Sequence, residues 1–189
     1  MASIACAKHR PQMATIPAGF MRKQEYDPSR KASVEKVDVN VTESQVRTKV
    51  VEVVTRKSET RPIEQAETVV CGGFGVGNKE NWKIVEDLAV VLGGSVGATR
   101  PACDEGWAKL EEQMVGQSGK TVHPKLYIGI GVSGAAHHLI GIEDSKVIVA
   151  INTDAKAPIM KAADYVIHAD YRQVVPALIG ELEKFKLRA

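Results

Sequence analysis

One segment of this sequence has residue types and spacing that suit phosphate binding, Gly129-Ile130-Gly131-Val132-Ser133-Gly134. Its glycines fit the pattern G-x-G-x-x-G, and it lies between a β-prone stretch and a candidate helix. The N–H groups at a helix start and the helix dipole favour a pyrophosphate, and Ser133 adds a hydroxyl donor. Asp154 follows about twenty residues later, the offset expected of a carboxylate that binds a ribose. The segment favours nucleotide binding, with an accidental match as the alternative.

Other small polar residues and glycines follow further β-prone stretches. These segments are residues 72–77, Thr99-Arg100, residues 152–154 and Asp170-Tyr171. Ligands of open α/β sheets bind outside the carboxyl ends of the strands, so we expect these segments to converge on one ligand. Residues 72–77 form either a second phosphate-facing turn or a flexible bend, and Arg100 is either a ligand contact or a solvated charge.

A polar loop and a pair of histidines complete the candidate site. Residues 116–120 can present an amide and a hydroxyl to a ligand, or form an ordinary surface turn. His137 and His138 follow the glycine loop, and we expect one of them to face the ligand edge of the sheet. They lack a Cys or carboxylate at metal-ligand spacing. Because nothing positions a base beside a nucleophile, the sequence offers no machinery for substrate chemistry.

Composition indicates a folded domain with its glycines concentrated in one region. The 189 residues are 44% hydrophobic and 25% charged, with a net charge of +2, which suits a buried core and argues against nucleic acid as a partner. Fourteen of the sixteen glycines lie between Gly72 and Gly141. Such crowding indicates backbone that turns tightly or approaches a ligand closely.

Cysteine usage and hydropathy bear on the compartment. The cysteines, Cys6, Cys71 and Cys103, are too few and too dispersed for a disulfide framework or a zinc site. No apolar run approaches the length needed to span a bilayer, and the first residues lack the pattern of a secretory signal. We expect a cytoplasmic protein, or a mitochondrial-matrix protein in a eukaryote, without membrane insertion.

From Thr68 onward the sequence alternates between strand and helix patterns, which predicts a parallel α/β sheet with helices on both faces. Asn78 is the expected N-cap of the first helix and Gly93 its stop. Pro176 is expected to interrupt the last helix. The predicted strands span residues 68–71, 95–99, 125–132, 146–153 and 165–169, and the predicted helices span residues 79–92, 133–140, 158–163 and 172–186.

The first third of the chain has a different pattern. β-branched residues are concentrated in residues 34–41 and 49–55, which predicts two strands. The polar stretch 58–67, with Arg61-Pro62, predicts a linker. The predicted organisation is therefore an arm with β-strands over residues 1–57, a linker over 58–67 and a domain over 68–189.

In this order, the segments of the domain resemble the carboxy-terminal domain of electron transfer flavoprotein alpha subunits. The likeness runs from about residue 68 to the end, and residues 9–15 with 34–57 resemble the end of that family's amino-terminal domain. The matching segments are Val96-Gly97-Ala98-Thr99-Arg100-Pro101, Val115-Gly116-Gln117-Ser118-Gly119-Lys120, Leu126-Tyr127-Ile128, residues 131–139, Val149-Ala150-Ile151-Asn152, Ala157-Pro158-Ile159 and Ala163-Asp164-Tyr165.

The resemblance implies a Rossmann-like (DHS-like) sheet with FAD as cofactor, preceded by a β-rich remnant of a second α/β domain. It implies an electron carrier rather than an enzyme, paired with a beta subunit. Such carriers accept electrons from flavin dehydrogenases, such as the acyl-CoA dehydrogenases of fatty acid beta-oxidation, and pass them to a downstream acceptor, by simple or bifurcating transfer. The residues themselves leave two alternatives open, an NAD(P)-dependent oxidoreductase and a non-redox nucleotide-binding module.

The resemblance also carries FAD contacts onto residues of this chain. Reduced flavin is anionic, so a fixed arginine beside the ring raises the reduction potential. Hydrogen bonds from a hydroxyl near N5 and an imidazole near O2 tune the same equilibrium. The implied contacts are Thr99 and Arg100 near the isoalloxazine, Val115, Gly116, Gln117 and Ser118 along the ring, Ser133, Gly134, Ala135, Ala136, His137 and His138 around the cofactor, with His138 at the pyrimidine edge, and Asn152, Asp170 and Tyr171 on the adenosine side.

Three residues depart from the family pattern. Phe74 stands where many relatives have an arginine, so one charged contact is absent. His137 stands where the family usually has a glutamine, which changes the hydrogen bonding and pH response. Ser118 replaces a common threonine and keeps the hydroxyl.

Overall fold

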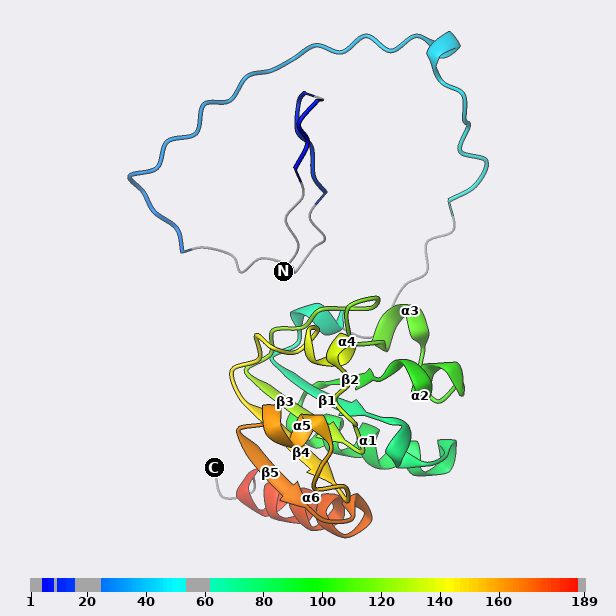
Figure 1. Ribbon diagram of the computed structural model, residues 1–189, viewed down its shortest axis with the longest axis vertical. Coiled ribbons are helices and arrows are strands. Elements are labelled where there is room, and N and C mark those ends of the chain that lie inside the picture. Colours follow the sequence, from blue (N-terminus) through cyan, green and yellow to red (C-terminus); the bar gives the residue numbers. More distant parts are fainter. Residues whose placement is uncertain (1–4, 9, 16–24, 54–61, 187–189) are drawn as a thin grey trace. The chain divides into compact units, whose positions relative to one another are not determined.

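Five parallel strands in the described part of the chain form one sheet, in the order β2-β1-β3-β4-β5 (Figure 1). The computed structural model describes residues 5–8, 10–15, 25–53 and 62–186. Every neighbouring pair of strands is parallel, which confirms the predicted α/β sheet. The strands are β1 (Thr68–Gly72), β2 (Ser95–Ala98), β3 (Leu126–Ile130), β4 (Ile148–Asn152) and β5 (Tyr165–His168).

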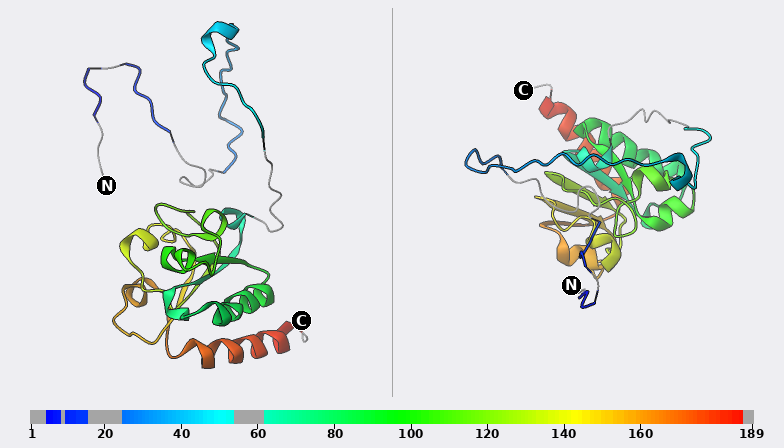
Figure 2. Two further views of the ribbon diagram at one scale, coloured as in Figure 1. Left: turned by 90° about the vertical axis from the view of Figure 1, so that its right-hand side faces the viewer. Right: turned by 90° about the horizontal axis from the view of Figure 1, so that it is seen from above.

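Helices cover both faces of this sheet because its strands are apolar on both sides. Val70 packs with α1 and α6, while its neighbours Val69 and Cys71 point to the opposite face, beneath α5. The views in Figure 2 show α1 and α6 lying side by side on one face. The helices are α1 (Lys79–Leu92), α2 (Arg100–Asp104), α3 (Leu110–Gln113), α4 (Ala136–Leu139), α5 (Pro158–Ala162) and α6 (Tyr171–Lys186), with 3-10 turns η1 (Glu43–Gln45), η2 (Ile63–Gln65) and η3 (Phe74–Val76).

The strand order creates a switch point between β1 and β3. From β1 the chain moves outward to β2, and it then returns to the other side of β1 as β3. The loops that leave β1 and β3 therefore run in opposite directions and open a crevice at the carboxyl edge of the sheet. The predicted glycine segments lie in these two loops.

Local signals set the ends of α1 where the sequence predicts them. The side chain of Asn78 accepts a hydrogen bond of 2.8 Å from the N–H of Asn81, which is N-cap geometry. Gly93 has a φ of +63° and ends the helix in the left-handed conformation. Both predictions are confirmed.

Replacing Asn78 by Ala should lower the free energy of unfolding by about 1 kcal/mol, because the first turn of α1 loses its side-chain acceptor. Urea denaturation of the two proteins measures the difference. Lys79→Ala, one residue further on at an exposed position, is the matched control and should change stability by less than about 0.5 kcal/mol. Equal midpoints for all three proteins would show that the cap contributes nothing.

Two helix predictions are wrong. Pro176 does not interrupt α6, which runs continuously from Tyr171 to Lys186. Pro176 has no backbone N–H, so the helix lacks one hydrogen bond there. The packing of α6 offsets this loss, because the buried Val175 lies in the same turn and the helix contacts α1. The helix predicted over residues 133–140 shortens to the four residues of α4, because the preceding loop is held in an irregular shape described below.

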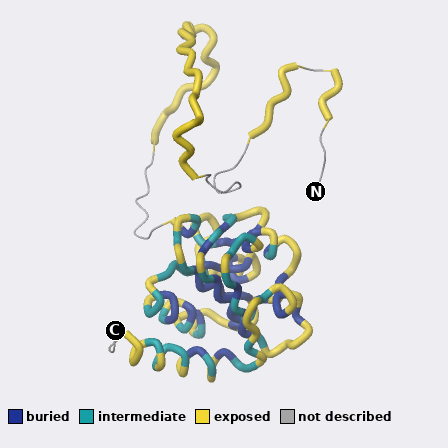
Figure 3. Tube along the Cα trace, turned by 90° about the vertical axis from the view of Figure 1, so that its left-hand side faces the viewer, coloured by how far each residue is buried: buried dark blue, intermediate teal, exposed yellow. Residues whose placement is uncertain are grey.

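The strands predicted in residues 34–41 and 49–55 are also absent from the described part of the chain. The last two residues of the second prediction, Val54 and Thr55, lie outside the described residues. Residues 25–53 contain only η1, and their valines are exposed, Val51 at 96% (Figure 3). A strand needs a neighbour for its backbone hydrogen bonds and a surface that buries its alternating side chains. The described part of this unit, which comprises residues 21–59, supplies neither.

The segment predicted as a linker is partly folded onto the domain. Ile63 in η2 is 3% exposed and belongs to the core on the α5 side of the sheet. Glu64 forms an ion pair of 2.7 Å with Lys120. The domain therefore begins before the predicted boundary at residue 68. No helix in the described ranges is long and apolar enough to cross a membrane.

Candidate functional site

The two glycine loops at the switch point contact each other through their backbones. The N–H of Gly73 donates to the carbonyl of Ile130 at 2.9 Å, and the N–H of Gly75 donates to the carbonyl of Gly131 at 3.0 Å. A Cβ on Gly73 would lie 2.2 Å from the carbonyl oxygen of Gly131. These glycines are therefore required for the close approach of two chain segments, which decides against a flexible bend in residues 72–77.

Three other elements hold the loop after β3 in its shape. Gly131 and Gly134 have φ values of +60° and +80°, so the loop cannot continue as a helix from Ser133. The side-chain amide of Asn152 donates to the carbonyl of Val132 at 2.8 Å. The first turn of α5 donates to the same loop, from the N–H of Ile159 to the carbonyl of Ser133 at 3.1 Å.

A cleft of about 700 Å³ opens at this edge of the sheet. Its volume falls within the range of small-molecule and cofactor sites. It brings together most of the residues singled out from the sequence, from four separate segments of the chain. The predicted residues that line it are Thr99, Arg100, Val115, Gly116, Gln117, Ser118, Ser133, Gly134, Ala135, His137, His138 and Asn152.

The remaining predicted residues lie outside this lining, and eight others belong to it. Ala136 is absent from the lining. Asp170 and Tyr171 line a smaller cavity of about 110 Å³ that shares Gly75, Gly131 and Asn152 with the cleft. Five of these eight belong to segments singled out from the sequence as candidate ligand contacts, although not to the implied FAD contacts: Phe74, Gly75, Gly131, Val132 and Asp154. Pro101 and Ala157 lie beside such segments, and no sequence signal pointed to Met114. The added residues are Phe74, Gly75, Pro101, Met114, Gly131, Val132, Asp154 and Ala157.

Thr99 contributes a hydroxyl with unused hydrogen-bonding capacity. The residue is 8% exposed, and its Oγ1 has no partner in the described part of the chain. Its N–H is bound to the carbonyl of Gly72 at 3.0 Å, which fixes the residue at the end of β2. A buried hydroxyl without a partner is costly, so the position indicates a polar ligand atom in the cleft.

Arg100 follows as the first residue of α2 and supplies the positive charge in the cleft wall. Its guanidinium lies 3.6 Å from the carboxylate of Asp104, one turn further along the helix. The side chain is 62% exposed, so this ion pair is weak and leaves donors available to a ligand.

The segment 115–118 forms a wall of the cleft rather than an ordinary surface turn. The N–H of Val115 donates to the carbonyl of Ala98 at 2.9 Å, and the N–H of Gln117 donates to the carbonyl of His137 at 2.7 Å. The ring nitrogen Nδ1 of His137 lies 2.6 Å from the side-chain oxygen of Gln117. Gln117 and His137, both of which line the cleft, are thus joined by their side chains.

His138 does not offer a ring nitrogen to the cleft. Its Nε2 lies 2.7 Å from the hydroxyl of Tyr127, and its Nδ1 lies 3.0 Å from the carbonyl of Val115. Burial lowers the pKa of His138 to about 4, so the ring is neutral at physiological pH. The expected imidazole hydrogen bond to a ligand is therefore not available in this geometry, although the residue lines the cleft.

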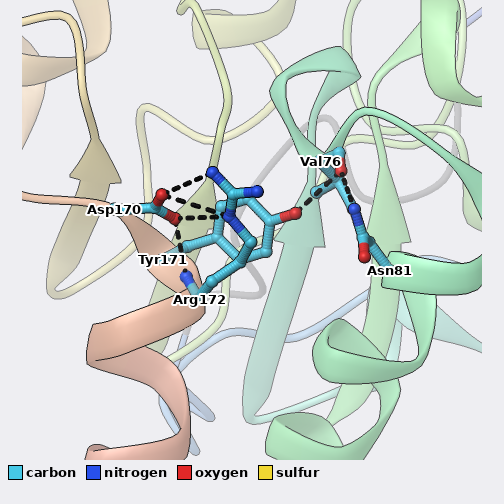
Figure 4. Close-up of polar contacts among 5 residues, drawn as sticks. All are labelled: Val76, Asn81, Asp170, Tyr171 and Arg172. Carbon is cyan, nitrogen blue, oxygen red and sulfur yellow. Dashed lines mark hydrogen bonds and ion pairs between the residues drawn. The ribbon is translucent and has the colours of Figure 1, made fainter.

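Tyr171 and Arg172 begin α6 directly after Asp170, and Tyr171 attaches the helix to the η3 turn. Figure 4 shows the Tyr171 hydroxyl and the Asn81 amide converging on the carbonyl of Val76, at 2.8 and 3.1 Å. The hydrogen bonds from Arg172 lower the pKa of the Asp170 carboxyl, which remains ionised beside the smaller cavity. The Tyr171 hydroxyl is thus engaged inside the protein.

Asp154 closes the turn that follows β4. Its carboxylate accepts a hydrogen bond of 2.8 Å from the N–H of Lys156, and its own N–H donates to the side-chain oxygen of Asn152 at 2.9 Å. This turn gives Asp154 a structural role independent of a ribose. Within the described ranges, no group of three His, Cys, Asp or Glu side chains is arranged to hold a metal ion.

A doubly wound α/β domain with a cleft at its switch point defines the class of this protein, in which ligands bind at that edge. Residues 62–143 match the family model described as the electron transfer flavoprotein FAD-binding domain. Over this range the chain is similar to the FAD-binding domain of electron transfer flavoprotein alpha subunits.

Similarity to individual relatives covers nearly the whole chain. The chain is 47% identical to Protein FixB of Clostridium saccharobutylicum over 184 residues, which are 97% of this chain and 54% of that protein. It is 45% identical to the electron transfer flavoprotein subunit alpha of Thermoanaerobacterium thermosaccharolyticum, over 98% of this chain and 56% of that protein. The acryloyl-CoA reductase electron transfer subunit beta of Anaerotignum propionicum is 38% identical, over 98% of this chain and 52% of that protein. The chain spans about half the length of these relatives.

Proposed function

We propose that the cleft at the carboxyl edge of the sheet binds FAD and that the chain carries electrons rather than catalysing a reaction on a substrate. The observation that carries the proposal is the buried hydroxyl of Thr99, which has no hydrogen-bond partner among the described residues and lies in a cleft of about 700 Å³. The family model, described as an FAD-binding domain, supports the same cofactor. When bound, FAD supplies reversible uptake of electrons.

The residues of the chain fit the parts of this ligand by their chemistry. Thr99 would donate or accept one hydrogen bond, and Arg100 would stabilise negative charge on the ring. Residues 115–118 would line the ring, with the Ser118 hydroxyl as a donor. The loop 131–135, whose shape Asn152 and α5 hold, would face the phosphates, while Asp170 and its neighbouring cavity would take the adenosine side.

The names of the relatives support a proposal for the partners of the carrier. We propose a heterodimer with a beta subunit, electron entry from a flavin dehydrogenase such as an acyl-CoA dehydrogenase, and exit to a downstream acceptor. The support is the electron transfer subunit of acryloyl-CoA reductase among the relatives. Bifurcating transfer, with a second flavin in the partner, remains one form of this proposal.

A second candidate, binding of NAD(P), is favoured by Asp154, which lines the cleft together with residues of the G-x-G-x-x-G loop. Release and identification of the bound cofactor separates the two. Purified protein should yield FAD in a ratio of about one per chain. A colourless protein that binds NAD(P) and not FAD would overturn the proposal.

Replacing Thr99 by Val should change affinity and stability in opposite directions. The substitution removes a buried hydroxyl without a partner, so the free energy of unfolding should rise slightly, by less than about 1 kcal/mol. Binding of FAD should weaken about tenfold, because one ligand hydrogen bond is lost. Thermal unfolding and flavin fluorescence titration measure the two effects. Thr99→Ser, which keeps the hydroxyl, should bind FAD like the natural protein; equal weakening in both variants would contradict the role of Oγ1.

A further inference from the structure

Behind the wall of the cleft lies a short chain of buried polar side chains from β1, β3 and α4. Tyr127 and Cys71 are fully buried, and His138 is 7% exposed. The hydroxyl of Tyr127 lies 2.7 Å from Nε2 of His138, and Nδ1 of the same ring lies 3.0 Å from the carbonyl of Val115. The surrounding cluster is otherwise apolar. Misplacing a hydrogen here would leave a buried polar atom without a partner.

The chemistry of these contacts permits one arrangement of hydrogens. A carbonyl oxygen only accepts, so Nδ1 of His138 must carry the hydrogen that Val115 receives. The ring is neutral at physiological pH, so Nε2 is an acceptor. The Tyr127 hydroxyl must then donate to Nε2.

Packing keeps Tyr127 in place for this bond. A Cβ on Gly129, two residues along β3, would lie 3.2 Å from the Tyr127 ring, so the glycine leaves room for the aromatic side chain. The Cys71 thiol lies against the hydroxyl, and burial raises the thiol pKa to about 12, so it brings no charge. Neither Gly129 nor the weak Cys71 thiol offers Nε2 of His138 a hydrogen donor as strong as the Tyr127 hydroxyl.

The bond from His138 reaches the functional surface through Val115. Val115 begins the segment 115–118 that we propose to line the flavin ring, and the N–H of Gln117 donates to the carbonyl of His137. Helix α4 therefore contacts this segment through two side-chain hydrogen bonds, from His138 to Val115 and between His137 and Gln117, and through one backbone hydrogen bond. Of these three, the bond to Val115 is the one that depends on which nitrogen of His138 carries the hydrogen.

We infer that Tyr127 is a positioning residue for the cleft: by donating to Nε2 it confines His138 to the Nδ1–H form, and that hydrogen holds Val115 and the ring-lining segment in place. That this segment lines a flavin ring rests on the proposed function. The inference about the hydrogen bonds concerns the chain alone.

The test is the protonation pattern of His138 in the full chain, read by two-bond ¹H–¹⁵N correlation spectra of ¹⁵N-histidine-labelled protein without added cofactor. The natural protein should show the hydrogen on Nδ1 only. Tyr127→Phe should give a mixture of both forms, while Tyr165→Phe, the same substitution at an exposed position, should not. A hydrogen on Nε2 in the natural protein would overturn the inference, and this measurement needs no variant to fold.

A titration with FAD tests the consequence for the cleft. Tyr127→Phe should weaken FAD about tenfold and Tyr165→Phe should leave the affinity within about twofold of the natural value. Natural-like FAD affinity in a Tyr127→Phe protein with mixed protonation would overturn the positioning role. Failure of every protein to bind FAD would instead overturn the proposed function, whereas the Nδ1–H form in the spectra would still support the bond.

Discussion

Gly73→Ala should destabilise the protein by at least about 3 kcal/mol, because the new methyl group has no space to enter. Its Cβ would lie 2.2 Å from the carbonyl oxygen of Gly131 and 2.7 Å from the Cα of Val132. Both are backbone atoms in a loop that Asn152 and Ile159 also hold, so they cannot move away cheaply. The φ of Gly73 is −101°, which any residue adopts, so the effect is steric rather than conformational.

Urea denaturation gives the size of this effect, and Gly180→Ala is its matched control. Gly180 lies inside α6, and a Cβ there has nothing within 4 Å. That substitution should stabilise the protein by about 0.5–1 kcal/mol through helix propensity. Because Gly73→Ala separates the two loops at the switch point, it should also abolish FAD binding at any concentration that saturates Gly180→Ala. A stable, FAD-binding Gly73→Ala protein would refute the described contact of the loops.

Stability should fall by up to about 3 kcal/mol between pH 6.5 and pH 4 because of His138 alone. In the folded protein burial lowers the pKa of His138 to about 4, from the ordinary histidine value of 6.5. Below the unfolded pKa, the unfolded chain binds a proton that the folded chain does not, so acid favours unfolding. The contribution is fully present above pH 6.5 and is lost as the pH approaches the folded pKa.

The difference between the natural protein and His138→Gln isolates this effect. Carboxyl groups with lowered pKa, such as those of Glu64 and Asp170, also lose their contributions in acid, but both proteins share them. Free energies of unfolding measured at several pH values should converge as the pH falls from 7 to 4, with the natural protein losing more. Parallel curves would contradict a neutral, buried His138, and titration of its ring protons by NMR checks the same pKa directly.

The start and end of α1 show how far local sequence signals reach. Asn78 and Gly93 act on backbone groups within a few residues, so their side-chain type decides the helix ends whatever packs nearby. The alternation of strands and helices from Thr68 likewise predicts a parallel sheet, and parallel strands bring their following loops to one edge. Most cleft residues could therefore be predicted from the sequence, since they lie in those loops.

Other features depend on contacts between distant parts of the chain. Pro176 suggests a helix break by its own chemistry, but packing of α6 against α1 keeps the helix continuous. The valines of residues 25–53 suggest strands by their propensity, but a strand forms only against a partner. In both cases tertiary contacts, present around Pro176 and absent around the described valines, decide the secondary structure more strongly than the intrinsic preference of the residue.

The sequence by itself determined the class of fold, the crowding of glycines into one region and the loops that meet at the carboxyl edge of the sheet, because these follow from periodicity and strand direction. The tertiary structure decided what those residues do there. Gly73 and Gly75 allow two backbones to come into contact, and both ring nitrogens of His138 are hydrogen-bonded, to Tyr127 and Val115, residues 11 and 23 positions away. Such roles depend on distances of a few ångströms between segments remote in the chain, which no local pattern specifies.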